Sequence, residues 1–314
     1  MKKYLLKAIF FLVLVYALGW ALDFAVSKGL MKMDDYRFMS WADLSDGSAS
    51  SDLLIMGNSR ALSHFEPWTI TDTCGVSAYN LGVGGYSITV QTLKYNYYRL
   101  HNAKPKFIVQ QVDYYTMRDD SVPGNHQSEQ FMPLIYDKGI RTELKRCGYS
   151  WPDLNCPMYR YFGYQQVIKN GLLEFLHAKH YVSDPSRLGH HYEHGELDVA
   201  RNDELETQIA KMSPTAQAHF ESYLSECQKE GIFVILVNSP TYKVRTEKTA
   251  GLDEVNSYYS EVADRYGAVY LNYEDYHLCD DPSYFAAAVH LNPEGTHIFS
   301  SDFAGKLKEI LQLQ

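Results

Sequence analysis

Short apolar runs alternate with longer helical stretches over most of this 314-residue sequence. Five runs have the length and the flanking turn residues of buried strands: residues 52–57, 76–82, 106–113, 231–240 and 268–272. The stretches with helical character are residues 88–101, 203–230, 251–266 and 294–311. Strands that alternate with helices form a parallel sheet covered on both faces. The sequence therefore predicts an α/β fold with a flavodoxin-like, doubly wound, five-stranded parallel sheet, whose sites lie at the carboxyl ends of the strands.

The N-terminal residues predict a membrane anchor. Lys2 and Lys3 precede an apolar stretch, residues 4–22, that nearly reaches the ~20 residues needed to span a bilayer. A cleaved signal peptide has the same layout, but Ala17-Leu18-Gly19 is a mediocre cleavage site. We therefore expect residues 1–27 to be a short cytoplasmic segment and an uncleaved transmembrane signal anchor. Positive residues before the apolar stretch place the rest of the chain outside the cytoplasm, on the periplasmic side of the inner membrane.

The remaining chain is expected to form a stalk and one domain. Residues 28–51 are polar and rich in Ser and Asp, which predicts the stalk. Residues 52–314 carry the five predicted strands, with an insertion over residues 114–201 that is rich in Tyr, His and Pro and lacks clear periodicity. Loops of that length inside a compact domain are usually functional, so the insertion is interpreted as a lid or a recognition element.

The composition argues against several classes of function. A formal net charge of −9 excludes an extended phosphate-binding surface and hence nucleic acid as a partner. The five cysteines show no metal-binding spacing, although Cys147 and Cys156 are close enough to pair in an oxidising compartment. The insertion contains a loose group of side chains that could bind zinc: His190, His191, Glu193, His194 and Glu196. Their spacing favours a solvated loop, and we expect neither a metal nor a cofactor.

Three segments at the predicted carboxyl edge of the sheet carry chemical groups. Gly57-Asn58-Ser59-Arg60 follows the first strand, so Ser59 can act as a nucleophile if a base reaches it. The simpler interpretation of that segment alone is a helix cap. Arg60 could contact an acyl or anionic group, or pair with a nearby carboxylate.

The second segment, Asn80 to Gly85, follows the second strand. Its glycines would let backbone N–H groups point at a ligand oxygen, as in one wall of an oxyanion hole, and a plain glycine-rich turn is the alternative. The third segment places His290 just before Asn292-Pro293, an N-cap followed by proline at the first helical position. His290 is therefore expected on a loop that enters the last helix from the same edge of the sheet.

In this order the three segments resemble the blocks of the SGNH (GDSL-like) hydrolase superfamily, over roughly residues 52–311. Ser59 matches the serine of the first block, Gly82 and Gly85 the second block, and His290 with Asn292 the last. The closest likeness is to the membrane-anchored branch that includes DltD-like and alginate O-acetylation (AlgJ/AlgX-like) proteins.

The resemblance implies an SGNH hydrolase fold and a serine O-acyl esterase or O-acyltransferase acting on a cell-surface glycan. Ser59 would be the nucleophile and His290 the base, with Ser59, Gly85 and Asn58 as oxyanion donors. Arg60 and Asn80 would contact the substrate. A membrane-bound O-acyltransferase is the implied partner, and the Tyr-rich insertion would hold the glycan. A lipolytic esterase is a third interpretation, against which the polar insertion argues.

Two departures from the family pattern stand out. The third strand ends in Gln110-Gln111-Val112-Asp113, without the family's oxyanion Asn. Ala287 occupies the position where the family has the Asp that orients the histidine. Three explanations stay open: a Ser-His dyad oriented by a backbone carbonyl or by Asp280 or Asp281, an engineered Asp-to-Ala change, or a degenerate glycan-binding or scaffold subunit of an O-acylation complex.

Overall fold

The computed structural model describes residues 1–120, 122, 127–199 and 206–313. The chain divides into two compact units. One, which we call the N-terminal unit, consists of Met1–Ala42 and Ser121–Pro185. The other, the sheet unit, consists of Asp43–Asp120 and Ser186–Gln314.

The sheet unit is built on a five-stranded sheet in which every pair of neighbouring strands is parallel. Its strands are β2 (Leu53–Met56), β3 (Ala78–Asn80), β4 (Phe107–Gln111), β7 (Phe233–Asn238) and β9 (Val269–Asn272). All five predicted strands are thereby confirmed. Their spatial order, β3-β2-β4-β7-β9, is the order 2-1-3-4-5 of flavodoxin-like doubly wound sheets. The direction of winding changes beside β2, so the carboxyl ends of β2 and β4 are the expected place for a site.

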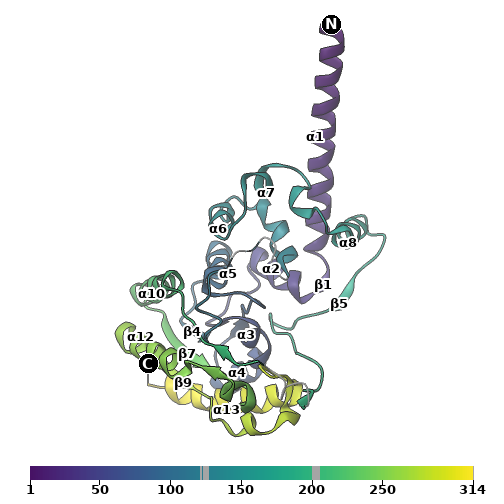
Figure 1. Ribbon diagram of the computed structural model, residues 1–314. Coiled ribbons are helices and arrows are strands. Elements are labelled where there is room, and N and C mark those ends of the chain that lie inside the picture. Colours follow the sequence, from purple (N-terminus) through teal and green to yellow (C-terminus); the bar gives the residue numbers. More distant parts are fainter. Residues whose placement is uncertain (121, 123–126, 200–205, 314) are drawn as a thin grey trace. The chain divides into compact units, whose positions relative to one another are not determined.

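Helices cover both faces of this sheet (Figure 1). They are α3 (Ser59–His64), α4 (Pro67–Cys74), α5 (Ile88–His101), α10 (Pro214–Lys229), α11 (Lys243–Glu247), α12 (Leu252–Tyr266) and α13 (Pro293–Leu311). Successive strand residues point to opposite faces. Leu53 and Ile55 pack in one cluster with Ile70 of α4 and with Phe299 and Phe303 of α13. On the other face α10 packs against α5 and α12.

Short elements complete the sheet unit. They are β6 (Gln208–Ile209), β8 (Thr249–Ala250), the 3-10 helices η3 (His277–Asp280) and η4 (Pro282–Tyr284), and the strands β10 (Phe285–Ala287) and β11 (His290–Leu291). The antiparallel pair β10-β11 precedes α13 directly and carries both Ala287 and His290. This pair therefore sets the position of the predicted base.

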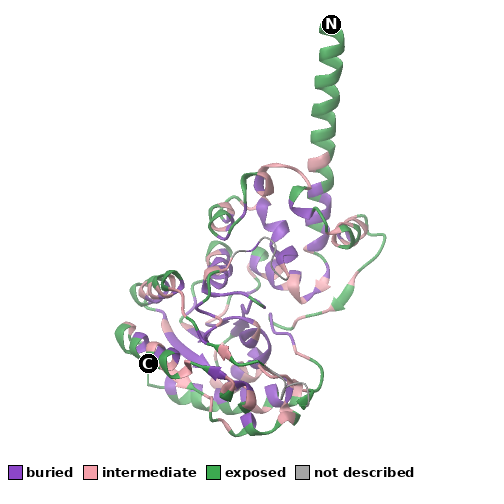
Figure 2. Ribbon diagram, viewed as in Figure 1, coloured by how far each residue is buried: buried purple, intermediate pink, exposed green. Residues whose placement is uncertain are grey.

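The N-terminal unit is largely helical. Its elements are α1 (Lys2–Leu30), β1 (Asp34–Asp35), η1 (Ser128–Tyr136), α6 (Arg141–Arg146), α7 (Trp151–Asn155), η2 (Tyr159–Tyr161), α8 (Gln165–Phe175) and β5 (Val182–Asp184), with the start of α2 (Tyr36–Asp46). α1 and α8 touch through glycines, because a Cβ on Gly29 would lie 1.7 Å from the carbonyl oxygen of Gly171. The first part of α1 is exposed, whereas Val26 and Leu30 lie in the core of the unit (Figure 2).

This division corrects the predicted domains. Residues 28–51 are not a stalk, since they contain the end of α1 and the whole of α2, with Phe38 and Trp41 buried. The predicted domain of residues 52–314 with an insertion over 114–201 is also wrong in its boundaries. The described residues between 121 and 185 pack with residues 1–42 into a separate unit. Some aromatic residues of the insertion, such as Tyr161, lie in the core of that unit.

All five cysteines are free thiols, so the pairing that the spacing of Cys147 and Cys156 would permit is not formed. Each of the two residues ends a different short helix, α6 and α7. Burial raises the pKa of the Cys147 thiol to about 12, which keeps it protonated and unreactive.

Candidate active site

Ser59 is held at the carboxyl edge of the sheet by a tight turn after β2. Gly57 has φ 145°, and a Cβ there would lie 2.7 Å from the Cβ of Ala61, so only glycine fits. Asn58 caps α3 by accepting a hydrogen bond from the backbone N–H of Arg60 at 2.9 Å. Ser59 is the first residue of α3 and is partly exposed. The cap role predicted for this segment belongs to Asn58, which leaves the Ser59 hydroxyl available.

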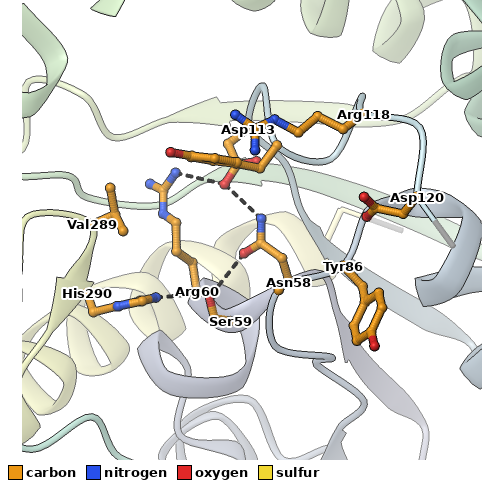
Figure 3. Close-up of a pocket in the computed structure, with 11 residues that line it drawn as sticks. Asn58, Ser59, Arg60, Tyr86, Asp113, Arg118, Asp120, Val289 and His290 are labelled. Atoms are coloured by element: carbon orange, nitrogen blue, oxygen red, sulfur yellow. Dashed lines mark hydrogen bonds and ion pairs between the residues drawn. The ribbon is translucent and has the colours of Figure 1, made fainter. Parts of the chain in front are cut away.

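His290 contacts Ser59, although 231 residues separate the two in the sequence. The Nε2 atom of His290 lies 2.8 Å from the Oγ atom of Ser59 (Figure 3). Two hydrogen bonds from Asn292 fix the approach, because its Oδ1 accepts from Gly295 N at 3.0 Å and its Nδ2 donates to the Ser283 carbonyl at 2.6 Å. The structure thus brings together the two residues that the sequence singled out as nucleophile and base.

The surroundings of His290 favour its neutral form. Burial lowers the pKa of His290 below its usual value, and the Arg60 guanidinium acts in the same direction. The carboxylate of Glu193 acts in the opposite direction. A neutral imidazole whose Nε2 accepts the Ser59 hydroxyl hydrogen has the arrangement that a general base needs.

A second histidine, His64, lies behind the pair and was not identified from the sequence. Its Nε2 accepts a hydrogen bond from the backbone N–H of Leu291 at 3.1 Å, and its Nδ1 is 2.9 Å from the Ser239 hydroxyl. Because Nε2 is an acceptor, the proton of the neutral ring is on Nδ1 and is donated to Ser239. Burial keeps the pKa of His64 well below its usual value. His64 therefore fixes β11, and with it the neighbouring His290, as a positioning residue.

The acid that would orient His290 is not where the sequence placed it. Ala287 pairs with His290 across the β10-β11 hairpin and carries no acid. Asp280 is paired with Lys243 at 2.7 Å, and Asp281 caps η4 by accepting from Ser283 N. Neither forms a hydrogen bond with His290 among the described contacts. Glu193 is the carboxylate with the largest effect on His290. In the sequence Glu193 stood out only as a member of the loose histidine and glutamate group, because 97 residues (290 − 193) separate it from His290.

A buried ion pair supports the floor of the site. The guanidinium of Arg60 lies 3.2 Å from Asp113 Oδ2 and also donates to Asn238 Oδ1 and to the Ser239 carbonyl. Asp113 accepts a further bond from Asn58 Nδ2 at 2.9 Å. Although burial acts to raise it, the pKa of Asp113 is held below its usual value by Arg60 and by these hydrogen bonds. Of the two interpretations weighed for Arg60, the structure shows the pairing with a carboxylate.

This network limits Asn58 as an oxyanion donor. Both ends of its side-chain amide are engaged, Oδ1 with Arg60 N and Nδ2 with Asp113. Asn80 is also engaged, because it is fully buried, donates to the Ala61 carbonyl at 2.7 Å and accepts from Gly82 N at 2.8 Å. Asn80 therefore lies outside the site, contrary to its predicted contact with substrate, and instead fixes the turn after β3.

The Ser59-His290 pair opens into a cavity of about 240 Å³. Its lining comes from the carboxyl ends of β2, β3 and β4 and from the β10-β11 hairpin: Asn58, Ser59, Arg60, Gly85, Tyr86, Asp113, Tyr115, Arg118, Asp120, Val289 and His290 (Figure 3). Gly85 has φ 79°, and nothing lies within 4 Å of where its Cβ would be. A ligand can therefore approach its backbone closely.

Arg118 gives this cavity a positive group. Its guanidinium lies 4.1 Å from the ring centroid of Tyr115 and has no ion pair with any residue that the structure describes. Asp120, also in the lining, accepts a hydrogen bond from the backbone N–H of Ser87. Arg118 lies in the segment after β4, within the predicted insertion of residues 114–201, and no pattern in the sequence indicates a role for it.

Comparison with known proteins adds no assignment. No known protein-family model matches the chain, and no curated protein matches it significantly.

Proposed function

We propose that this protein is an SGNH-type serine O-acyl esterase or O-acyltransferase acting on a cell-surface glycan. The observation that carries the proposal is the 2.8 Å contact between Ser59 Oγ and His290 Nε2, at the mouth of a cavity lined by Gly85. A serine in contact with a neutral imidazole, at the carboxyl edge of a parallel sheet, is suited to nucleophilic acyl chemistry.

In this mechanism Ser59 Oγ bonds to the ester carbonyl carbon while its proton passes to His290 Nε2. The backbone N–H groups of Ser59 and Gly85 stabilise the oxyanion. When the intermediate collapses, the bond to the sugar oxygen breaks and that oxygen takes the proton from His290. The acyl group on Ser59 is then released to water or to a second sugar hydroxyl, with His290 again acting as the base.

The cavity limits the acyl group. At about 240 Å³ it lies below the roughly 300–1,000 Å³ that encloses drug-sized ligands, which favours a short chain such as acetyl. We therefore expect the full chain to hydrolyse p-nitrophenyl acetate at least about 10-fold more efficiently than the decanoate, measured as kcat/KM. A preference for the long chain would indicate a lipolytic enzyme instead.

The pH dependence follows from the state of His290. Only the neutral imidazole can accept the Ser59 proton, so activity is lost as pH falls through the His290 pKa. Because that pKa lies below its usual value, the acid limb of kcat/KM should have its midpoint below about pH 6.5. Glu193→Gln removes a group that raises this pKa, so the midpoint should shift further to acid, and a shift toward neutral pH would contradict the assignment.

Arg118 supports an anionic glycan as the substrate, because its guanidinium lacks a carboxylate partner among the described residues. Arg118→Ala should raise KM about 10-fold for an O-acetylated polyuronate and leave KM for acetylated xylan nearly unchanged. Arg265→Ala, on the exposed face of α12, is the matched control. An equal change in KM for both glycans would show that Arg118 does not recognise the charge of the substrate.

A degenerate glycan-binding subunit is the second candidate, and the observation that favours it is Ala287 at the position opposite His290. It predicts glycan binding that is the same in the native chain and in the Ser59→Ala and His290→Ala variants. Isothermal titration with an acetylated polyuronate distinguishes the two candidates once turnover has been measured.

We further propose that α1 holds the protein in a membrane. α1 is long and apolar enough to cross a bilayer, and its most apolar stretch contains no buried residue (Figure 2). The Tyr16 hydroxyl donates to the Asn155 carbonyl at 3.0 Å, so the helix is part of the folded unit, which favours an uncleaved anchor. The orientation predicted from Lys2 and Lys3 places the site on the periplasmic side.

A further inference from the structure

α1 passes without interruption from an exposed apolar surface into the core of the N-terminal unit. Asp23, on α1, is fully buried and forms two hydrogen bonds with the Arg160 guanidinium, at 2.6 and 2.7 Å. It also accepts from the Tyr136 hydroxyl and from the backbone N–H of Met158. With the close contact of Gly29 and Gly171, these bonds fix the unit on the helix. The depth of the helix in a bilayer therefore sets the depth of the unit.

The charged residues of α1 indicate how deep the helix lies in a bilayer. About 19 residues lie between Lys3 and Asp23, which at 1.5 Å of rise per residue extend about 29 Å, close to the ~30 Å hydrocarbon thickness of a bilayer. Lys7 lies one turn from Lys3 and can extend its ammonium back to the surface. If the bilayer-spanning part of α1 began after Lys7, the N-terminal unit would lie deeper in the bilayer. Asp23 therefore marks the far boundary of the hydrocarbon or a point within it.

The segment of residues 151–162 contacts α1 before that boundary. Its Asn155 carbonyl binds the Tyr16 hydroxyl, and Tyr16 lies about 10 Å before Asp23 along the helix axis. Helical side chains tilt toward the N-terminus, so this contact is no shallower than Tyr16 itself. A Cβ on Gly19 would lie 3.0 Å from Pro157 Cγ, which places the next turn of the segment against the helix as well.

The same segment exposes large aromatic side chains. Phe162 is 90% exposed, Trp151 70% and Tyr159 54%. On α1, the rings of Tyr16 and Trp20, one helical turn apart, are in edge contact. Exposed aromatic rings of this size are unfavourable in water but favourable at the interface between headgroups and hydrocarbon.

We propose that residues 151–162 form a second membrane contact, in which Trp151, Tyr159 and Phe162 insert into the interfacial layer of the bilayer that α1 spans. The occupant of this surface is lipid, because the same segment contacts the exposed, apolar part of α1 through Asn155 and Pro157. The contact is independent of the chemistry at Ser59.

The test is depth-dependent quenching of tryptophan fluorescence in the full chain, reconstituted in phosphatidylcholine nanodiscs. Trp20→Phe removes the anchor tryptophan, and Trp20→Phe/Trp151→Phe is its matched control, so the difference between their spectra is the emission of Trp151. Phe162→Trp in the control background gives an independent probe. Thermal melts of each variant verify folding, since Trp41 is fully buried and reports the core of the unit.

We expect lipids brominated near the headgroup end of the acyl chain to quench most of the Trp151 and Phe162→Trp emission, and lipids brominated near the terminal methyl to quench little. Iodide in the aqueous phase should quench neither strongly. The proposal is overturned if aqueous iodide quenches these probes and bromolipids do not. Protection from both quenchers would indicate a protein partner on this surface and would also overturn the proposal. The absence of bromolipid quenching of Trp20 in the Trp151→Phe chain would overturn it as well, because α1 would then not span the bilayer.

Discussion

Replacing Ser59 by alanine should lower ester turnover by about 10³-fold or more without loss of folded protein. The substitution removes the oxygen that lies 2.8 Å from His290 and leaves the α3 cap intact, because the cap is the Asn58 side chain. Steady-state hydrolysis of p-nitrophenyl acetate measures the loss, and an unchanged Tm shows that the chain is folded.

Ser301→Ala is the matched control for this variant. Ser301 is an exposed serine in the middle of α13 whose hydroxyl donates to the His297 carbonyl, and it does not line the cavity at Ser59. Its turnover should equal that of the native chain. If Ser59→Ala retained comparable turnover, the hydrolysis would come from another group, and the mechanism proposed for Ser59 would be wrong.

Asp113→Ala should cost about 3–5 kcal/mol of unfolding free energy, because it leaves the buried Arg60 guanidinium without its carboxylate. For a unit of this size the loss lowers Tm by about 10 °C. Arg60→Met/Asp113→Leu removes both charges and should regain part of the loss. Glu309→Ala, which breaks an exposed pair with Lys306, should change stability by less than about 0.5 kcal/mol.

The cost of Asp113→Ala should also depend on pH. The pKa of Asp113 is lowered in the folded chain. Its contribution to the free energy of unfolding is therefore fully present above its pKa in the unfolded chain, about 4, and is lost as pH falls through its pKa in the folded chain. The difference in Tm between the native and variant chains should therefore be full at pH 7 and shrink in acid. A difference that grew in acid would mean that Asp113 is not stabilised as a carboxylate.

Local patterns were sufficient to predict the sheet. Each strand is a short apolar run bounded by turn residues, and β7, with Ile235 and Leu236 buried, shows why such runs are easy to recognise. Ser59 and His290 were found because each sits beside a distinct local signal, the Gly57 turn in one case and Asn292-Pro293 in the other. Such signals depend on backbone conformation within a few residues.

The features that the sequence did not predict depend on contacts between distant residues. Residues 28–51 are mostly polar, which predicted a stalk. Phe38 and Trp41 nevertheless lie on the buried side of α2, and their burial makes α2 a packed helix. The Arg60-Asp113 pair and the bond from Leu291 N to His64 join segments about 50 and 230 residues apart. Neither residue type nor spacing marks such partners in advance.

The most direct measurement of the central claim is labelling with a serine-reactive fluorophosphonate, followed by peptide mapping, on the full chain and on Ala287→Asp. Residues paired across an antiparallel hairpin have neighbouring side chains, so an Asp at position 287 would lie beside the His290 ring. We predict that Ser59 is labelled in both proteins, and faster in Ala287→Asp, and that His290→Ala abolishes the labelling. If folded native chain is not labelled at Ser59, whether or not Ala287→Asp is, this protein is not a serine acyl enzyme as it stands, and the glycan-binding candidate takes its place.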